Sequence, residues 1–233
     1  MNTTAENLTS DLTSVNEKLR NELQEQKQRE QVLQGELLHL RTTLDGIEKV
    51  LSLLLESRDP YMMGYYKKVS NIAVRFAQEM GLSERKSEAI RLAAILSDVG
   101  MINIPHDIPS KPGRLMSHEM DLIRVHPKIG HDYLMLVPFE EPIPQIVLQH
   151  HENYDGSGYP SGLAGDQILV EARILAVATA IDSMDRDRPY RPALGLSLAL
   201  KQIGESRGMK YDPEVVDVCM RVFSGEGGGT QFF

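Results

Sequence analysis

HHENYDGSGYPSGLAGDQI, residues 150–168, is the stretch that decides how the surrounding chain folds. Two adjacent histidines and an acid come first, and four glycines then follow with Pro160 among them. Glycine and proline at this density cannot continue a helix, so the segment is predicted to be a tight, ordered loop. Since most glycine-rich loops are only turns, the meaning of this one depends on the residues on either side.

Outside this loop, apolar residues recur at the three- and four-residue steps of amphipathic helices. The run ILVEARILAVATAID, residues 168–182, follows the loop directly. Ser83 can cap the start of a helix, and Gly81 ends the preceding one. No alternating strand pattern is visible. The predicted fold is therefore all-α, with helices near 64–80, 83–99, 117–124, 127–136, 140–151, 170–186, 193–206 and 213–223.

Residues 1–57 form a segment of a different kind. They contain no proline and are rich in Glu, Gln, Lys, Arg and Leu, all good helix formers. Apolar residues alternate at steps of four and three, at Leu33, Leu37, Leu40, Leu44, Ile47, Leu51 and Leu54. This period of 3.5 residues predicts a left-handed coiled-coil seam, weakened where Gln26 and Glu30 occupy seam positions. A parallel homodimer is favoured by the narrow seam, and a single amphipathic helix folded against the rest of the chain is the alternative.

The overall composition excludes several classes of protein. The 233 residues suffice for one well-packed domain with an extension. A net charge of −8 argues against a nucleic-acid duplex as the partner. Cys219 is the only cysteine, which excludes an intramolecular disulfide and a zinc site built on thiolates. The first residues lack a signal-peptide pattern, and no run reaches about 18 apolar residues, so a cytoplasmic protein without a membrane span is expected.

The loop and its flanks together resemble the signature of the HD-GYP family. The resemblance extends through LAAILSDVGMINIP, KPGRL, HPKIG and DRPYRPA, and covers about residues 58–220. It implies a helical HD-superfamily core that encloses two or three metals, commonly iron or manganese, and hydrolyses cyclic di-GMP. Bridged metals in such a core would generate hydroxide at neutral pH and clamp the scissile phosphodiester.

The family register divides the implied metal centre into retained and changed positions. The retained ligands are Asp98, His126, His150 and His151. The changed positions are Tyr65 and Ser97 in place of histidines, Met101 in place of lysine and Thr179 in place of aspartate. Because the remaining set is too small for two metals with three or more protein ligands each, we expect no cofactor, or at most one loosely bound iron or manganese. We also expect Ser97, Thr179 or a histidine to hydrogen-bond the Asp98 carboxylate, since an unpaired buried charge is costly.

The family positions that do not bind metal differ less from the HD-GYP pattern than the metal ligands do. The resemblance implies that basic side chains of the KPG and RPYR segments can meet the phosphates of a dinucleotide, namely Lys111, Arg114, Arg188 and Arg191. It also implies that the GYP loop can be a docking surface for a diguanylate cyclase domain, through Asp155, Gly156, Gly158, Tyr159 and Pro160. The alternatives are that these cations are solvated surface charges and that the loop only shapes the rim of a cavity.

Three hypotheses follow for the domain organisation of a stalk (1–57), a degenerate HD-GYP domain (58–223) and a flexible tail (224–233). The favoured one is a catalytically impaired or inactive domain that binds cyclic di-GMP or a signalling partner and dimerises through its stalk. The second is an active, metal-dependent cyclic di-GMP phosphodiesterase with a reduced metal site. The third is a structural dimer module that binds no nucleotide.

Overall fold

The fold was analysed in a computed structural model, which describes residues 2–58, 60–187 and 191–224. This part of the chain consists of helices joined by turns and loops, and it contains isolated β-bridges but no strand. The α-helices are α1 (Asn2–Glu56), α2 (Tyr65–Glu79), α3 (Glu84–Leu96), α4 (Ser117–Ile123), α5 (His126–Leu134), α6 (Ile143–Gln149), α7 (Val170–Asp185), α8 (Leu196–Glu205) and α9 (Pro213–Ser224). Three short 3-10 helices accompany them, η1 (Pro60–Met62), η2 (Val99–Asn103) and η3 (Gly165–Gln167).

The prediction of an all-α fold with a long N-terminal helix is confirmed. Each helix predicted from periodicity has a counterpart within a few residues, and the 3-10 helices were not predicted. The Ser83 side chain accepts a hydrogen bond from the Lys86 backbone N–H at 3.4 Å, as a helix cap should. Gly81 follows α2 with a left-handed φ of 71°, a conformation that glycine adopts without strain.

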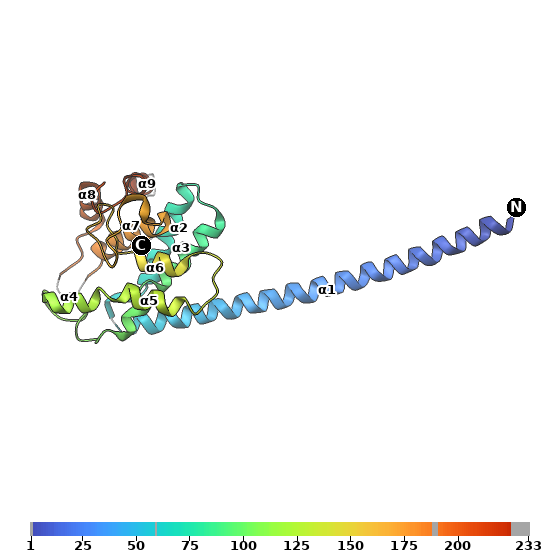
Figure 1. The fold of residues 1–233 in the computed structure, drawn as a ribbon, viewed down its shortest axis with the longest axis horizontal. Coiled ribbons are helices and arrows are strands. Elements are labelled where there is room, and N and C mark those ends of the chain that lie inside the picture. The colour runs from blue at the N-terminus through green and yellow to red at the C-terminus, as the bar shows by residue number, and fades with distance from the viewer. Residues whose placement is uncertain (1, 59, 188–190, 225–233) are drawn as a thin grey trace. The chain divides into compact units, whose positions relative to one another are not determined.

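The chain divides into two compact units, Met1–Val50 and Leu51–Phe233. Residues 2–50 of the first unit lie in the single helix α1, and the second unit is a helical bundle, in which α2 to α9 gather in Figure 1. The domain boundary predicted at residue 57 stays a prediction. Of the tail predicted for residues 224–233, Ser224 is the last residue of α9, and the others lie outside the described residues.

The second unit has one apolar core. Helix α2 packs against α3, α7 and α9, while α5 packs against α6 and η2. Burial of these apolar side chains is the main stabilising contribution to the bundle. The largest fully buried apolar side chains are Ile72, Phe76, Ile90, Ile146, Ile168, Ile174, Leu175, Ile181 and Ile203. The core therefore draws on helices from both sides of the glycine-rich loop and holds that loop between α6 and α7.

The thiol of Cys219 is expected to be unreactive in the folded protein. Its side chain is fully buried on α9, and burial raises the pKa of this thiol to about 12. Since the thiolate is the nucleophile, reaction with a disulfide reagent at pH 8 should be slow until the protein unfolds. Time courses of thiol release with and without denaturant measure this. Rapid reaction of the native protein would contradict the described burial.

Among the helices of the described chain, none has the length and apolar character needed to cross a membrane.

Candidate functional site

Three histidines are brought together by the ends of two helices. His126 is the first residue of α5, and His150 and His151 follow the last residue of α6. Helix α5 lies close to η2 because Gly100 has no side chain: a Cβ at this position would lie 2.1 Å from the His126 carbonyl oxygen. The close approach of the two backbones places Asp98, just before η2, beside His126.

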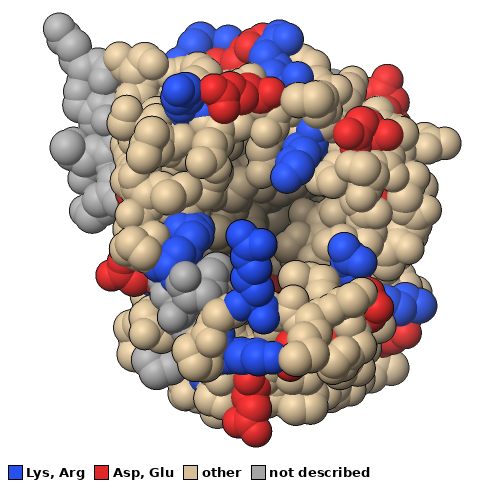
Figure 2. All heavy atoms as spheres, turned by 90° about the vertical axis from the view of Figure 1, so that its left-hand side faces the viewer, with Lys and Arg blue, Asp and Glu red and all other residues tan. Residues whose placement is uncertain are grey.

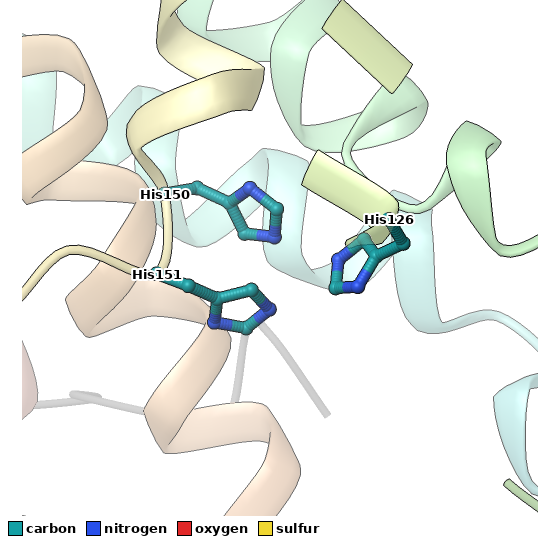
Figure 3. A group of neighbouring side chains, drawn as sticks. All are labelled: His126, His150 and His151. Atoms are coloured by element: carbon teal, nitrogen blue, oxygen red, sulfur yellow. The ribbon is translucent and has the colours of Figure 1, made fainter. Parts of the chain in front are cut away.

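The three imidazoles converge on a common space (Figure 3). One ligand atom from each, of His126, His150 and His151, lies within 4.8 Å of the others. The Nδ1 of His126 lies 2.7 Å from the Ile123 carbonyl oxygen, and that of His150 lies 2.6 Å from the Val147 carbonyl oxygen. Because a carbonyl oxygen only accepts, both Nδ1 atoms carry the proton in the neutral rings. Their Nε2 atoms are thereby left as lone-pair donors for a metal.

Burial keeps the tandem pair in its neutral form. The pKa of His150 is lowered to about 4, first by burial and then by the neighbouring His126. Burial also lowers the pKa of His151 well below its ordinary value, with His150 and His126 adding to the effect. Both imidazoles are therefore unprotonated at neutral pH, the state in which histidine binds a metal.

The half-buried Asp98 carboxylate lies at the edge of this cluster. Its Oδ1 is 3.4 Å from the buried Nε2 of His126, which makes no hydrogen bond within the described chain. The Tyr66 hydroxyl donates a hydrogen bond of 3.4 Å to Oδ2. The prediction that Ser97, Thr179 or a histidine would hydrogen-bond Asp98 is wrong, because Ser97 donates to the Ala94 carbonyl oxygen at 3.1 Å and the buried Thr179 hydroxyl has no partner in the described chain.

Asp98, His126 and His151 line a cavity of about 340 Å³. The cavity is also lined by Tyr65, Met101 and Thr179. At these positions the resemblance implies a histidine, a lysine and an aspartate. The remaining lining of the cavity is mostly apolar or aromatic, and consists of Leu55, Arg58, Met62, Tyr66, His106, Pro109, Leu115, Met120, Ile123, Tyr159 and Ser183. The cavity therefore has a polar wall at the histidines and an apolar surface over most of the rest, which is typical of a site for a small organic ligand.

The glycine-rich loop is held by a buried carboxylate. Glu152 accepts hydrogen bonds from the backbone N–H groups of Ser161 at 2.7 Å and Leu163 at 3.2 Å. Asp155 accepts one from the Ser157 backbone N–H at 2.9 Å, and the Tyr159–Pro160 peptide bond is cis. The role of Glu152 was not predicted, although its sequence signal, an acid directly after the tandem histidines, was visible.

Replacing Gly158 with alanine is expected to destabilise the second unit. A Cβ there would lie 2.2 Å from the Asn153 backbone nitrogen and 2.5 Å from the Glu152 Cα, so the loop backbone would have to move. We expect the free energy of unfolding to fall by about 1–3 kcal/mol, measured by denaturant titration. Gly204→Ala is the control, because its Cβ would meet only the flexible methyl end of Met220, at 3.2 Å. Equal stability of both variants would contradict the described loop.

Tyr159 of this loop forms a stack at the cavity. Its ring packs on the His151 ring with centroids 4.8 Å apart and an interplanar angle of 27°. The Arg124 guanidinium lies over the Tyr159 ring, 5.7 Å from its centroid. A cation on an aromatic face at this distance is attractive. The stack joins the end of α4, the loop and the histidine cluster.

The cations predicted to meet phosphates lie in different surroundings. Lys111 pairs with Glu119 at 2.8 Å, and the Arg191 guanidinium donates to backbone carbonyls, that of Ser183 at 2.7 Å among them. Arg114 is exposed, and Arg188 lies outside the described residues. None of the described three lines the cavity.

Two other arginines, which sequence reasoning missed, stand nearer to it. Arg58 lines the cavity and donates to the carbonyl oxygens of Met101 at 2.5 Å and Ile104 at 2.7 Å, which ties the end of α1 to η2. Arg124 lies over Tyr159, a lining residue. Figure 2 shows a face of the molecule that is hollowed near its middle, with Lys and Arg side chains around the hollow. Such a face suits an anionic ligand although the net charge of the chain is negative.

The residues present fit a metal ion at the histidine cluster. The Nε2 of His126 is buried and has no hydrogen bond to any described residue, two rings have their Nδ1 atoms held by carbonyl oxygens, and Asp98 lies beside them. Imidazole and carboxylate donors suit iron, manganese or zinc. Tyr65, Met101 and Thr179 also line the cavity and supply no strong ligand to it.

Comparison with known proteins agrees with this geometry. Residues 49–215 match the HD domain family. The chain is 37% identical over 209 residues to the cyclic di-GMP phosphodiesterase response regulator RpfG of Xanthomonas campestris pv. campestris, covering 87% of this chain and 55% of that protein. It is 38% identical over 178 residues to a cyclic di-GMP phosphodiesterase of Thermotoga maritima, covering 75% of this chain and 48% of that protein. It thus spans about half the length of these two relatives.

A solved structure supports the fold. The chain superposes on the cyclic GMP-AMP specific phosphodiesterase V-cGAP3 of V. cholerae with a TM-score of 0.63 and 17% identity, covering 80% of this chain and 50% of that one. The likeness at this identity concerns the fold alone.

The expectation that the chain holds no cofactor is wrong. It rested on counting lost ligands along the sequence. The structure instead gathers His126, His150 and His151 into a set of neutral imidazoles that converge as metal donors. The chain is also similar to cyclic di-GMP phosphodiesterases, and its resemblance to the HD-GYP family implies a metal centre. Three ligands drawn from the ends of two helices suffice for a metal site, whatever has changed at the other lining positions.

Proposed function

Because the chain belongs to the HD domain family, we propose that its second unit binds a cyclic dinucleotide, in the first place cyclic di-GMP, beside a metal ion held by His126, His150 and His151. The observation that carries this proposal is the convergence of three imidazoles, two of which, those of His126 and His151, line a cavity of about 340 Å³. The names of the two relatives, both cyclic di-GMP phosphodiesterases, support the choice of ligand.

The metal, when bound, would supply a positive charge for a phosphate oxygen and lower the pKa of a bound water. The chain's own residues hold and orient the ligand around it. Asp98 is placed to neutralise part of the charge, and the Ile123 and Val147 carbonyl oxygens fix the ring orientations of His126 and His150. Contact of a nucleobase with the apolar and aromatic lining of the cavity, and of a phosphate with Arg124 or Arg58, would complete the site.

Hydrolysis is proposed to be impaired. Thr179 and Tyr65 face the cavity where the HD-GYP resemblance implies aspartate and histidine, and Met101 faces it where the resemblance implies lysine. A tyrosine hydroxyl would have to lose a proton near pH 10 to ligate well, and methionine carries no charge for a phosphate. The cavity therefore keeps what is needed to bind one metal and a ligand, and lacks the second set of ligands that would bridge two metals.

An active phosphodiesterase is the second candidate, favoured by the names of the relatives. The chain is further proposed to work as a homodimer through α1 and to offer the GYP loop, from Asp155 to Pro160, to a signalling protein such as a diguanylate cyclase domain. The exposure of Asp155, Ser157 and Pro160 in this loop supports the docking proposal.

Three measurements on protein purified anaerobically without chelator separate these functions. Mass spectrometry gives the metal content per chain, calorimetry the affinity for cyclic di-GMP, and chromatography any linear dinucleotide or GMP. About one metal per chain, with binding and no product, is the expected result. Metal-dependent product release would establish the active enzyme instead. No metal uptake and no binding would leave a structural dimer and overturn the proposed function.

A further inference from the structure

Helix α1 carries an apolar stripe that nothing covers within the described chain. The members of the predicted seam are all exposed, between 38% and 63% of their surface, and are Leu33, Leu37, Leu40, Leu44, Ile47, Leu51 and Leu54. They recur on one continuous helix of 55 residues, which contains no proline. An uncovered apolar stripe of this length is a typical partner surface, and its narrowness suits one further helix.

We propose that this stripe pairs with α1 of a second copy of the chain as a parallel coiled coil in register, so that each seam residue meets its own counterpart. The inference rests on the homodimer included in the proposed function, and adds its orientation, its register and the side chains that select them. A helix of the same sequence is the occupant that the charges beside the seam favour.

Those charges are complementary only between particular pairs. In a parallel, in-register coiled coil, the residue just before an a position faces the residue five places later in the partner. Glu22 then faces Lys27 of the partner, and Glu36 faces Arg41 of the partner, with each pair formed twice. The other two junctions in this stretch, Arg29 with Gln34 and Thr43 with Glu48, bring no like charges together. Two of these four junctions therefore attract, and none of them repels.

The register is selected by polar residues inside the seam. Heptads counted back from Leu54 place Leu19 and Leu23 on the seam, with Asn16 and Glu30 at a positions. In register, Asn16 meets Asn16 and can hydrogen-bond it. Glu30 also meets its own counterpart, a like-charge pair that is offset by Arg29 of each chain, which lies beside Glu30 of the other. A shift by one heptad would press Asn16 or Glu30 against a leucine and bury it without a polar partner. These residues weaken the dimer and make the in-register pairing the favoured one.

Sedimentation of the full chain tests the pairing. A mass twice that of one chain is expected, and Leu37→Glu should weaken the dimer at least about 100-fold, because it puts two charges into the seam. Leu38→Glu is the matched control: its leucine is 67% exposed and lies next to Leu37 but off the seam, so the dimer should persist. A monomeric native chain, or equal loss in both variants, would overturn the inference.

Disulfide formation tests orientation and register. Leu23→Cys changes a seam position and keeps the polar residues Asn16 and Glu30 that select the register, and the natural Cys219 is buried and out of reach. Mild oxidation should convert most of the variant to a covalent dimer, since the two cysteines face each other only in the parallel, in-register arrangement. A dimer that does not cross-link would overturn this inference while leaving the proposed homodimer standing. Nucleotide and metal binding by the second unit is measured separately, so its failure is distinguishable from either outcome.

Discussion

Replacing His151 with alanine is expected to lower the affinity for manganese or ferrous iron at least about 100-fold, because even residues that only orient metal ligands are worth about 10–100-fold. His151 supplies one of the three imidazoles that lie within 4.8 Å of each other, and burial keeps it unprotonated at neutral pH. Its loss leaves His126 and His150, too few donors to hold the ion firmly. Anaerobic metal titration followed by calorimetry or mass spectrometry measures the effect.

The matched control is His106→Ala. His106 lines the same cavity, but it is exposed and lies outside the histidine cluster. Metal affinity should be unchanged in this variant, and both variants should unfold at similar denaturant concentrations. If His151→Ala binds metal as tightly as the native chain, the cluster is not the metal site, and the proposed function loses the observation that carries it.

The helices could be predicted from the sequence because their signals are local. Helical periodicity and a cap such as Ser83 depend on residues only three or four positions apart. Such residues are neighbours both along the chain and in the folded helix. The 3-10 helix η2 was missed, since it follows α3 so closely that the pattern reads as one helix up to Gly100. Its separate direction is set by the close contact of Gly100 with His126, 26 positions later, which no local pattern reveals.

From the sequence, the site could be predicted only at the positions that the family motifs specify. The resemblance selected His126, His150 and His151, which the structure brings together. It could not show that Lys111 is paired with Glu119, or that Arg124 lies over Tyr159, because the partner of an exposed cation depends on how separate elements pack. For the same reason the hydrogen-bond donor to Asp98 came from Tyr66 on α2, whereas Ser97, Thr179 or a histidine had been expected. Counting ligands also underestimated the metal site, since convergence is a property of the fold.

Replacing Thr179 with aspartate is expected to strengthen metal binding about tenfold or more and to make the stability of the protein depend on the metal. Thr179 lines the cavity with Asp98 and His126, and its buried hydroxyl has no hydrogen-bond partner in the described chain. Aspartate has nearly the same size and would add a carboxylate to the donor set. Without metal, this extra buried charge should lower the melting temperature, since it is costly unless paired. With manganese, the melting temperature should recover and exceed that of the native chain, because a ligand that binds only the folded state stabilises it.

Ser183→Asp is the control for this substitution, because Ser183 also lines the cavity from α7, one turn beyond Thr179. It adds the same charge in the same pocket at a position where the HD-GYP resemblance implies no ligand. A manganese-dependent rise in melting temperature only for Thr179→Asp would mean that the cavity retains the geometry of a larger metal centre and lacks chiefly its ligands. Equal behaviour of the two variants would mean that the wall around Thr179 has itself been rebuilt. The reduced site would then be a binding site in its own right, with hydrolysis beyond recovery by single substitutions.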